Sequence, residues 1–238
     1  MALNTNLTTP APCRPARSCL QYLHLLLPVA VAALICLANS GCSLGVMAGK
    51  LLMGDPKQTA PFRAATRTDL TKGKDSLLII CSAPHGILAH FPSIQIDIVE
   101  RMTLLLETRG VKVISADQVA TWFDDHGEWG DFSQLARSFD ADYIMNVEIR
   151  KFSHRVPDSE TLMQGQSEGR VTVSKAEGKS TTLVRQVFDR NFTLTFPTSY
   201  PVPRENRSEQ IFLEGFLDRL AIHLSQFMYD HRASETVH

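Results

Sequence analysis

The chain has 238 residues and a mass of 26.5 kDa, which allows one compact domain, or one domain with an N-terminal extension. Hydrophobic residues make up 44% of the chain and charged residues 21%, so disorder throughout is excluded. Five cysteines are too few for a disulfide-built scaffold, and a formal net charge of -1 excludes the strongly basic balance of a non-specific nucleic-acid binder.

The charges are unevenly distributed along the chain. Residues 1–41 carry two arginines and no acid, and residues 42–74 carry six basic against two acidic side chains. Residues 75–238 hold the other 16 basic and 23 acidic side chains, a net charge of -7. A basic segment beside a membrane is attracted to anionic headgroups, but the same composition also fits a solvated linker, and both interpretations stay open.

The first 42 residues have the three parts of a secretory signal. A polar region ends with Arg14 and Arg17, the apolar run 25–38 follows, and small residues close the signal just before Cys42. The 14 residues of the apolar run would form a helix of about 21 Å, well short of the ~30 Å hydrocarbon core of a bilayer.

The end of this signal, residues 37–42 with the sequence LANSGC, resembles the lipobox of bacterial lipoproteins, in which a cysteine is acylated and the chain is cut just before it. It departs from the usual pattern at Asn39, where an aliphatic residue is more common. The resemblance implies cleavage of the chain after Gly41 and lipidation of Cys42 with acyl chains that include palmitate. Two acyl chains on Cys42 would anchor the protein to the membrane stably without a spanning helix.

Two alternatives stay open for this segment. The small residues around Ser40 also fit an ordinary signal-peptide cleavage site, which would release a secreted protein. The segment could instead remain uncut as a single-pass anchor of structural role, with Gly41, Gly45 and Gly49 forming a face for helix pairing in lipid. All three interpretations place the later residues outside the cytoplasm. In the lipoprotein interpretation, Ser43 favours the periplasmic face of the outer membrane over the inner membrane.

Four segments are expected along the chain. They are a lipoprotein-type signal peptide at 1–41, a basic membrane-proximal tether at 42–75, an α/β periplasmic domain at 76–230, and a frayed tail at 231–238. The tether is expected because Asp55-Pro56 and Pro61 break any helix and Thr, Lys and Ala dominate the composition.

The first half of the domain alternates between predicted strands and helices. They are a strand at 77–81, a helix at 93–108, a strand at 111–114, helices from Ser115 to near Gly127 and at 133–139, and a strand at 143–149. This order predicts a sheet that begins with parallel β-α-β pairing.

The second half changes character, because residues 170–174 and 182–196 alternate in polarity or are rich in β-branched residues. These residues predict an antiparallel hairpin that extends the sheet. The polar residues 153–169 are expected to form a loop, either a partner-binding excursion or a flexible hairpin tip. A last amphipathic helix at 208–229 closes the domain. The expected fold class is α/β (α+β), a single mixed sheet with helices packed on it.

With these elements in place, residues 76–230 resemble periplasmic modules of envelope lipoproteins. The resemblance rests on the order strand, helix, strand, helix, on the segment Phe139-Asp-Ala-Asp-Tyr-Ile-Met-Asn-Val-Glu-Ile149 that enters a central strand, and on the hairpin with its closing helix. The group includes the curli-secretion lipoprotein, the lipoprotein activators of penicillin-binding proteins and the amino-terminal domain of the Tol-Pal propeller protein. The resemblance implies a non-catalytic module that binds or helps assemble an envelope protein complex, without nucleic acid or cofactor.

Two clusters of residues could carry chemistry. Cys81, His85 and His90 lie between a strand and a helix, but their spacing fits no common metal site. The acidic cluster, residues 124–128 with Asp124, Asp125, His126 and Glu128 beside Trp129, fits an acid/base or cation role or a solvated loop. No catalytic or metal residue is assigned. The competing hypothesis is an envelope hydrolase or metal-dependent enzyme. It requires the 82–92 loop and the acidic cluster to converge in one pocket that holds an acid or a histidine with a perturbed pKa.

Overall fold

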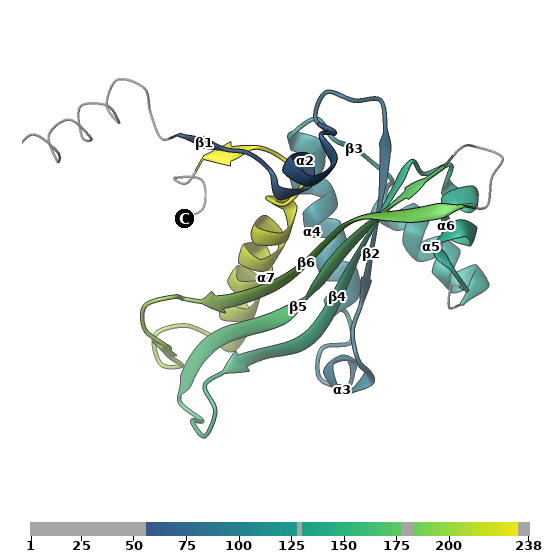
Figure 1. Ribbon diagram of the computed structural model, residues 1–238. Coiled ribbons are helices and arrows are strands. Elements are labelled where there is room, and N and C mark those ends of the chain that lie inside the picture. The colour runs from purple at the N-terminus through teal and green to yellow at the C-terminus, as the bar shows by residue number, and fades with distance from the viewer. Residues whose placement is uncertain (1–55, 128–129, 178–182, 233–238) are drawn as a thin grey trace, which may run out of the picture. The chain divides into compact units, whose positions relative to one another are not determined.

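The computed structural model describes residues 56–127, 130–177 and 183–232 (Figure 1). The signal peptide, the cleavage after Gly41 and the lipidation of Cys42 are predictions for residues that lie outside these ranges. Glu128 and Trp129 of the predicted acidic cluster also lie outside them.

The described residues form short and long elements of both kinds. In chain order they are β1 (Lys57–Gln58), α2 (Pro61–Thr66), β2 (Ser76–Ser82), α3 (His85–Leu88), α4 (Ile94–Thr108), β3 (Lys112–Val113), α5 (Ala116–His126), α6 (Phe132–Phe139), β4 (Tyr143–Arg155), β5 (Leu162–Ala176), β6 (Val184–Phe196), β7 (Val202–Pro203), α7 (Glu209–Ser225) and β8 (His231–Arg232).

The main sheet has the strand order β3-β2-β4-β5-β6, and β7 pairs with β5. β2 runs parallel to β3 and β4, whereas β4, β5 and β6 pair antiparallel. β2 lies inside the parallel part of the sheet and is buried on both faces, which explains its continuous apolar run. The mixed sheet and its packed helices confirm the predicted fold class.

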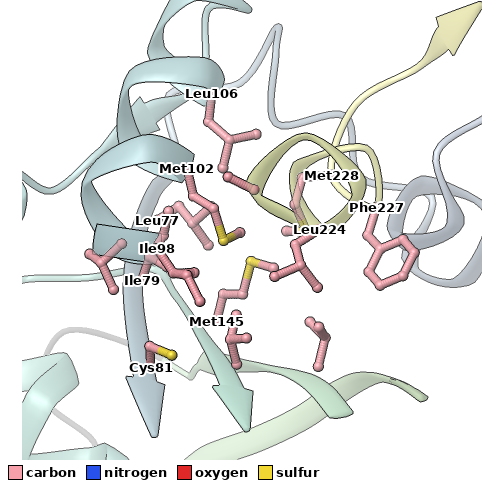
Figure 2. Packing of buried hydrophobic residues seen from close by; sticks show 14 of the residues in the cluster. Leu77, Ile79, Cys81, Ile98, Met102, Leu106, Met145, Leu224, Phe227 and Met228 are labelled. Atoms are coloured by element: carbon pink, nitrogen blue, oxygen red, sulfur yellow. The ribbon is translucent and has the colours of Figure 1, made fainter. Parts of the chain in front are cut away.

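Helices cover both faces of this sheet (Figure 1). Leu77, Ile79 and Cys81 of β2 point into the larger core beneath α4 and α7, where Met145 of β4 joins them (Figure 2). The alternate residues Leu78 and Ile80 point to the other face, into a smaller core beneath α5 and α6, together with Ile144. Successive side chains of a strand point to opposite faces, so one apolar run serves both cores.

The two long antiparallel strands extend beyond their predicted bounds. β4 continues to Arg155 and β5 already begins at Leu162, so the long polar loop expected at 153–169 is wrong. Its polar residues are strand residues, with Ser153 paired opposite Gln166. In β5 and in the last residues of β4, most of the less buried side chains are polar, which obscures the strand signal.

Residues 56–75, expected to belong to the tether, carry β1 and α2. Pro61 occupies the first turn of α2, where its missing N–H costs no helical hydrogen bond, so it opens a helix instead of preventing one. Phe62 and Leu70 are fully buried. β1 pairs with β8, which places His231 and Arg232 of the expected tail in the folded domain. The folded unit therefore begins by Pro56.

Within these ranges, no helix combines the length and the apolar composition needed to cross a membrane.

Candidate functional site

The carboxyl end of β2 is open on one side because β3 is short. β3 pairs with β2 at Ser76 and Leu77, and beyond this point that edge of β2 has no strand neighbour among the described residues. The side chain of Gln95, in the first turn of α4, partly replaces the missing strand, since its Nε2 donates a hydrogen bond to the Cys81 carbonyl at 3.1 Å.

A cavity of about 680 Å³ lies between this open strand end, α4 and α5. We call it the α4–α5 groove. Apolar side chains form most of its walls, and polar groups stand at a few points: the lining includes Ile80, Cys81, Ser82, Leu88, Gln95, Ile96, Val99, Val119, Phe123 and Asp124. Ile96 is 52% exposed, so part of this apolar lining is accessible to a partner or ligand.

The groove occupies a position that favours ligand binding in open sheets. The crossover from β2 to β3 runs through α4 on one face, and the crossover from β3 to β4 runs through α5 and α6 on the other. Where the connections that follow two adjacent strands run on opposite faces of the sheet, a crevice opens at the carboxyl ends of those strands. Pockets of about 300–1,000 Å³ with apolar walls and few polar groups are typical ligand sites.

The chemistry of the lining favours binding. Cys81 is 9% exposed, and burial raises the pKa of its thiol to about 12, so it is a neutral apolar side chain at physiological pH and not a nucleophile. Ser82, Gln95 and Asp124 can orient a bound group by hydrogen bonding. The arrangement can therefore hold an apolar group and fix its direction at a few points.

The two predicted loops partly converge here. Ser82 and Leu88 come from the 82–92 region, and Asp124 and Gly127 come from the predicted acidic cluster and its border, and all four line the groove. This convergence is one of the two conditions of the enzyme hypothesis, and Asp124 is the member of the predicted acidic cluster that meets it.

The predicted histidines lie elsewhere. The His126 ring stacks on the Trp122 ring at 4.6 Å between centroids, and its Nδ1 lies 3.0 Å from the Trp122 carbonyl oxygen, one helical turn away. His85 and His90 do not line the groove. Across the part of the chain that the structure describes, no group of three His, Cys, Asp or Glu side chains is arranged to hold a metal ion.

Sequence reasoning missed Gln95 and Ile96 as groove residues. Ile96 lies off the buried stripe of α4, which contains Ile94, Ile98 and Met102. An apolar residue on the polar side of an amphipathic helix was the available signal, but single exposed apolar residues are too common to locate a site.

An open strand edge is another surface at which a binding module can take up a partner. β6 has β5 as its one strand neighbour in the described ranges. Arg185, Asp189 and Arg190 are exposed along β6, and charged side chains on an edge strand discourage the addition of another strand. The α4–α5 groove is therefore the better candidate surface.

Comparison with known proteins yields structural likeness alone. No family model matches the chain, and no curated protein matches it. A dodecamer of PelC from Paraburkholderia phytofirmans is 13% identical with a TM-score of 0.41, and the match covers 73% of this chain and 97% of that one. Lipoprotein GNA1162 from Neisseria meningitidis is 11% identical with a TM-score of 0.36, covering 63% and 96%.

The C-terminal domain of LpoB from Salmonella enterica is 9% identical with a TM-score of 0.30, and the match covers 56% of this chain and 97% of that one. One of these neighbours is a lipoprotein by name. At these identities and TM-scores the likeness carries no conclusion about what this chain does.

Proposed function

We propose that this chain is an envelope lipoprotein whose α/β domain is a non-catalytic binding module. In this proposal the signal peptide is removed after Gly41, acylated Cys42 anchors the chain on the periplasmic face of the outer membrane, and residues 43–55 link the anchor to the domain. The lipobox-like sequence at 37–42 supports the anchor.

The observation that carries the binding role is the α4–α5 groove. Burial of apolar surface stabilises a complex by roughly 25 cal/mol per Å², and one or two large apolar anchors in a pocket dominate many interfaces. Phe123, Val99 and the half-exposed Ile96 would surround such an anchor. The bound partner is an envelope protein segment that carries a large apolar side chain, with Asp124 favouring a basic neighbour.

Intact mass spectrometry of the protein from the membrane fraction of a lipoprotein-processing host tests the anchor. The expected mass is that of residues 42–238 plus acyl groups, and Cys42→Ala should abolish it. A full-length mass would support an uncleaved anchor instead, and an unmodified truncated chain in the soluble fraction would support secretion.

Site-specific photo-crosslinking in cells tests the groove. A photoreactive residue at Ile96 should yield an adduct with an envelope protein. The matched control is Leu104, which lies on the same helix, is 64% exposed and does not line the groove. A second variant, Ala120→Trp, places a large ring in the groove and should abolish the Ile96 adduct. Equal adducts from both positions, or an Ile96 adduct that survives Ala120→Trp, would contradict groove binding.

The envelope hydrolase stays a second candidate because Ser82 and Asp124 line the same groove. It requires one of them to act on the bound group. Ser82→Ala and Asp124→Asn leave the apolar walls in place, so loss of cellular function with an intact Ile96 adduct would favour the hydrolase over the binding module.

A further inference from the structure

Four basic side chains from three elements gather on the side of α7 that faces β6. Arg219 and His223 lie one turn apart on α7, Arg190 lies on β6 and His231 on β8. The Phe227 ring contacts two of them, because the Arg190 guanidinium carbon lies 5.6 Å from its centroid and the His223 ring lies 5.4 Å from it in an edge-to-face contact. Arg219 and His231 are close enough to His223 for their charges to act on its imidazole. We call this group the α7–β6 basic cluster.

The charges of this cluster are not balanced by the surrounding side chains. In the described ranges, no carboxylate forms an ion pair with any of its four members. The neighbouring acids are engaged elsewhere: Asp230 pairs with Lys57 and Arg63, and Asp218 pairs with Arg101. Such a basic cluster is unexpected in residues 75–238, whose net charge is -7.

One donor of the cluster is both buried and unused. Nη1 of Arg219 has no hydrogen-bond partner although it is shielded from solvent. A guanidinium cannot lose its proton to relieve this cost, unlike a lysine or a histidine. Buried charged donors are normally paired, so an unpaired one points to an acceptor that binds there.

The surroundings of His223 give the same indication. Burial lowers the pKa of His223 first, and the positive charges of Arg219, Arg190 and His231 lower it further. The charges that lower the pKa of this imidazole are all positive. An anion between these groups would supply the missing acceptor and reverse the repulsion.

We propose that the α7–β6 basic cluster binds a phosphate group, with Arg190 and Arg219 as the principal donors. Arginine forks match the oxygen geometry of phosphate, and the imidazoles add further donors when protonated. Arg190 is exposed and His223 is half-buried, so the group can enter from solvent. This site goes beyond the binding role of the groove, to which Arg190 and Arg219 do not contribute.

Two sources share this chemistry, a soluble phosphate compound and the headgroup of an anionic phospholipid. His231 lies in β8, which pairs with β1, and the chain enters the domain at Pro56, next to β1. The cluster is thus close to the end of the domain where the preceding residues join it. This placement is compatible with either source, so the experiment must separate them.

Titration of the intact chain with inorganic phosphate, followed by calorimetry and by NMR of the histidine rings, tests the site. We expect saturable binding, together with an upward shift of the His223 pKa. Arg219→Gln and Arg190→Gln should each weaken binding by at least about tenfold, because each removes charge-assisted hydrogen bonds. The matched control is Arg185→Gln, an exposed arginine on the same strand that pairs with Glu177, and it should leave binding unchanged.

Arg219→Lys separates loss of binding from a folding defect, since it keeps the positive charge and removes the paired guanidinium donors. We expect a phosphate affinity between those of the unsubstituted protein and Arg219→Gln, with an unchanged circular dichroism spectrum. Absence of saturable phosphate binding, or equal weakening by Arg185→Gln, would overturn the proposal.

Co-sedimentation with phosphatidylglycerol vesicles, compared with phosphatidylcholine vesicles, identifies the source of the phosphate group. Binding to phosphatidylglycerol that phosphate competes away supports a lipid headgroup, and phosphate binding without vesicle binding supports a soluble compound. Cys42→Ala tests the anchor separately and should not change phosphate affinity.

Discussion

Replacing Asp142 with alanine should destabilise the domain by breaking the contact between Ser76, the first residue of β2, and Asp142, the residue just before β4. Asp142 Oδ2 accepts hydrogen bonds from the Ser76 backbone N–H at 2.7 Å and from Ser76 Oγ at 3.0 Å. Ser76 Oγ in turn accepts the Asp142 backbone N–H at 3.1 Å. Ser76 is 4% exposed, so water cannot easily replace these bonds.

The expected cost follows from the bonds that are lost. Asp142→Ala removes two charge-assisted hydrogen bonds and leaves the Ser76 N–H buried without this acceptor, which should cost about 3 kcal/mol of unfolding free energy. For a domain of this size, each kcal/mol lowers Tm by about 2–4 °C, so Tm should fall by about 6–12 °C. Ser76→Ala keeps the backbone bond to Asp142 and should cost about 1 kcal/mol.

The double variant tests whether the two residues act as one unit. Once Asp142 is absent, removal of the Ser76 hydroxyl should cost less, and the coupling energy should be about 1 kcal/mol. Urea unfolding of the form lacking residues 1–42, followed by far-ultraviolet circular dichroism, measures all four species. Asp125→Ala, at an exposed position on α5, is the control and should change stability by less than about 0.5 kcal/mol.

The reasoning would be refuted by a cost below about 1 kcal/mol for Asp142→Ala with an unchanged m-value, because the loss of two charge-assisted hydrogen bonds to the buried Ser76 should cost more than that. Strict additivity in the double variant would also contradict it, since two residues in direct hydrogen-bond contact should couple.

Three further predictions concern packing, pH and thiol reactivity. Gly165→Ala should cost more than about 2 kcal/mol in urea unfolding, because its Cβ would lie 2.5 Å from the Phe216 ring. The control Gly86→Ala has open space around it and should be neutral, so similar costs for the two variants would refute the packing argument. Burial lowers the pKa of His223 from its ordinary value of 6.5, so the folded state binds this proton less readily than the unfolded state does, and stability should fall as the pH drops below 6.5. In His223→Gln this part of the pH dependence should be weaker, and an unchanged stability profile would contradict the prediction. Cys81, with a thiol pKa of about 12, should react with a thiol reagent at pH 8 only upon unfolding, and rapid labelling of the native protein would disprove its burial.

Local patterns in the sequence predicted most of the core correctly. The helix at 93–108 was expected from its apolar stripe, and α4 buries Ile94, Ile98 and Met102 from that stripe. The alternation in 143–149 likewise matches the side chains that β4 sends into the larger core. These patterns are reliable because the period of a helix or strand determines which neighbouring residues share a face.

The same reasoning failed where context outweighed the local signal. Pro61 was expected to break structure, but at the start of α2 a proline is compatible with the helix. Residues 153–169 were expected to form a polar loop, but residues 162–169 belong to β5, which contains Gly165 and Gly169. Both glycines are in fact required in β5, since a Cβ on either would collide with a phenylalanine ring.

The candidate site depended still more on the tertiary structure. The convergence of the 82–92 loop and the acidic cluster was a condition of the enzyme hypothesis alone. The fold brings Ser82, Leu88 and Asp124 into the lining of the groove and leaves the histidines outside it. A side chain at the end of a helix can point into a groove or pack against another side chain of the same helix. His126 does the second, because its ring stacks on the Trp122 ring of α5. Sequence spacing does not determine that direction.

The sequence by itself predicted the signal-peptide pattern of residues 1–42, and it determined whether most segments are helices or strands and which apolar residues form the core. Each of these features depends on residues that are close together in the chain. The tertiary structure alone decided the short β3 that opens the α4–α5 groove and the approach of Arg190, Arg219 and His231 to His223. Those residues come from β6, α7 and β8, and their proximity follows from the path of the chain between elements. Local periodicity carries no information about that path.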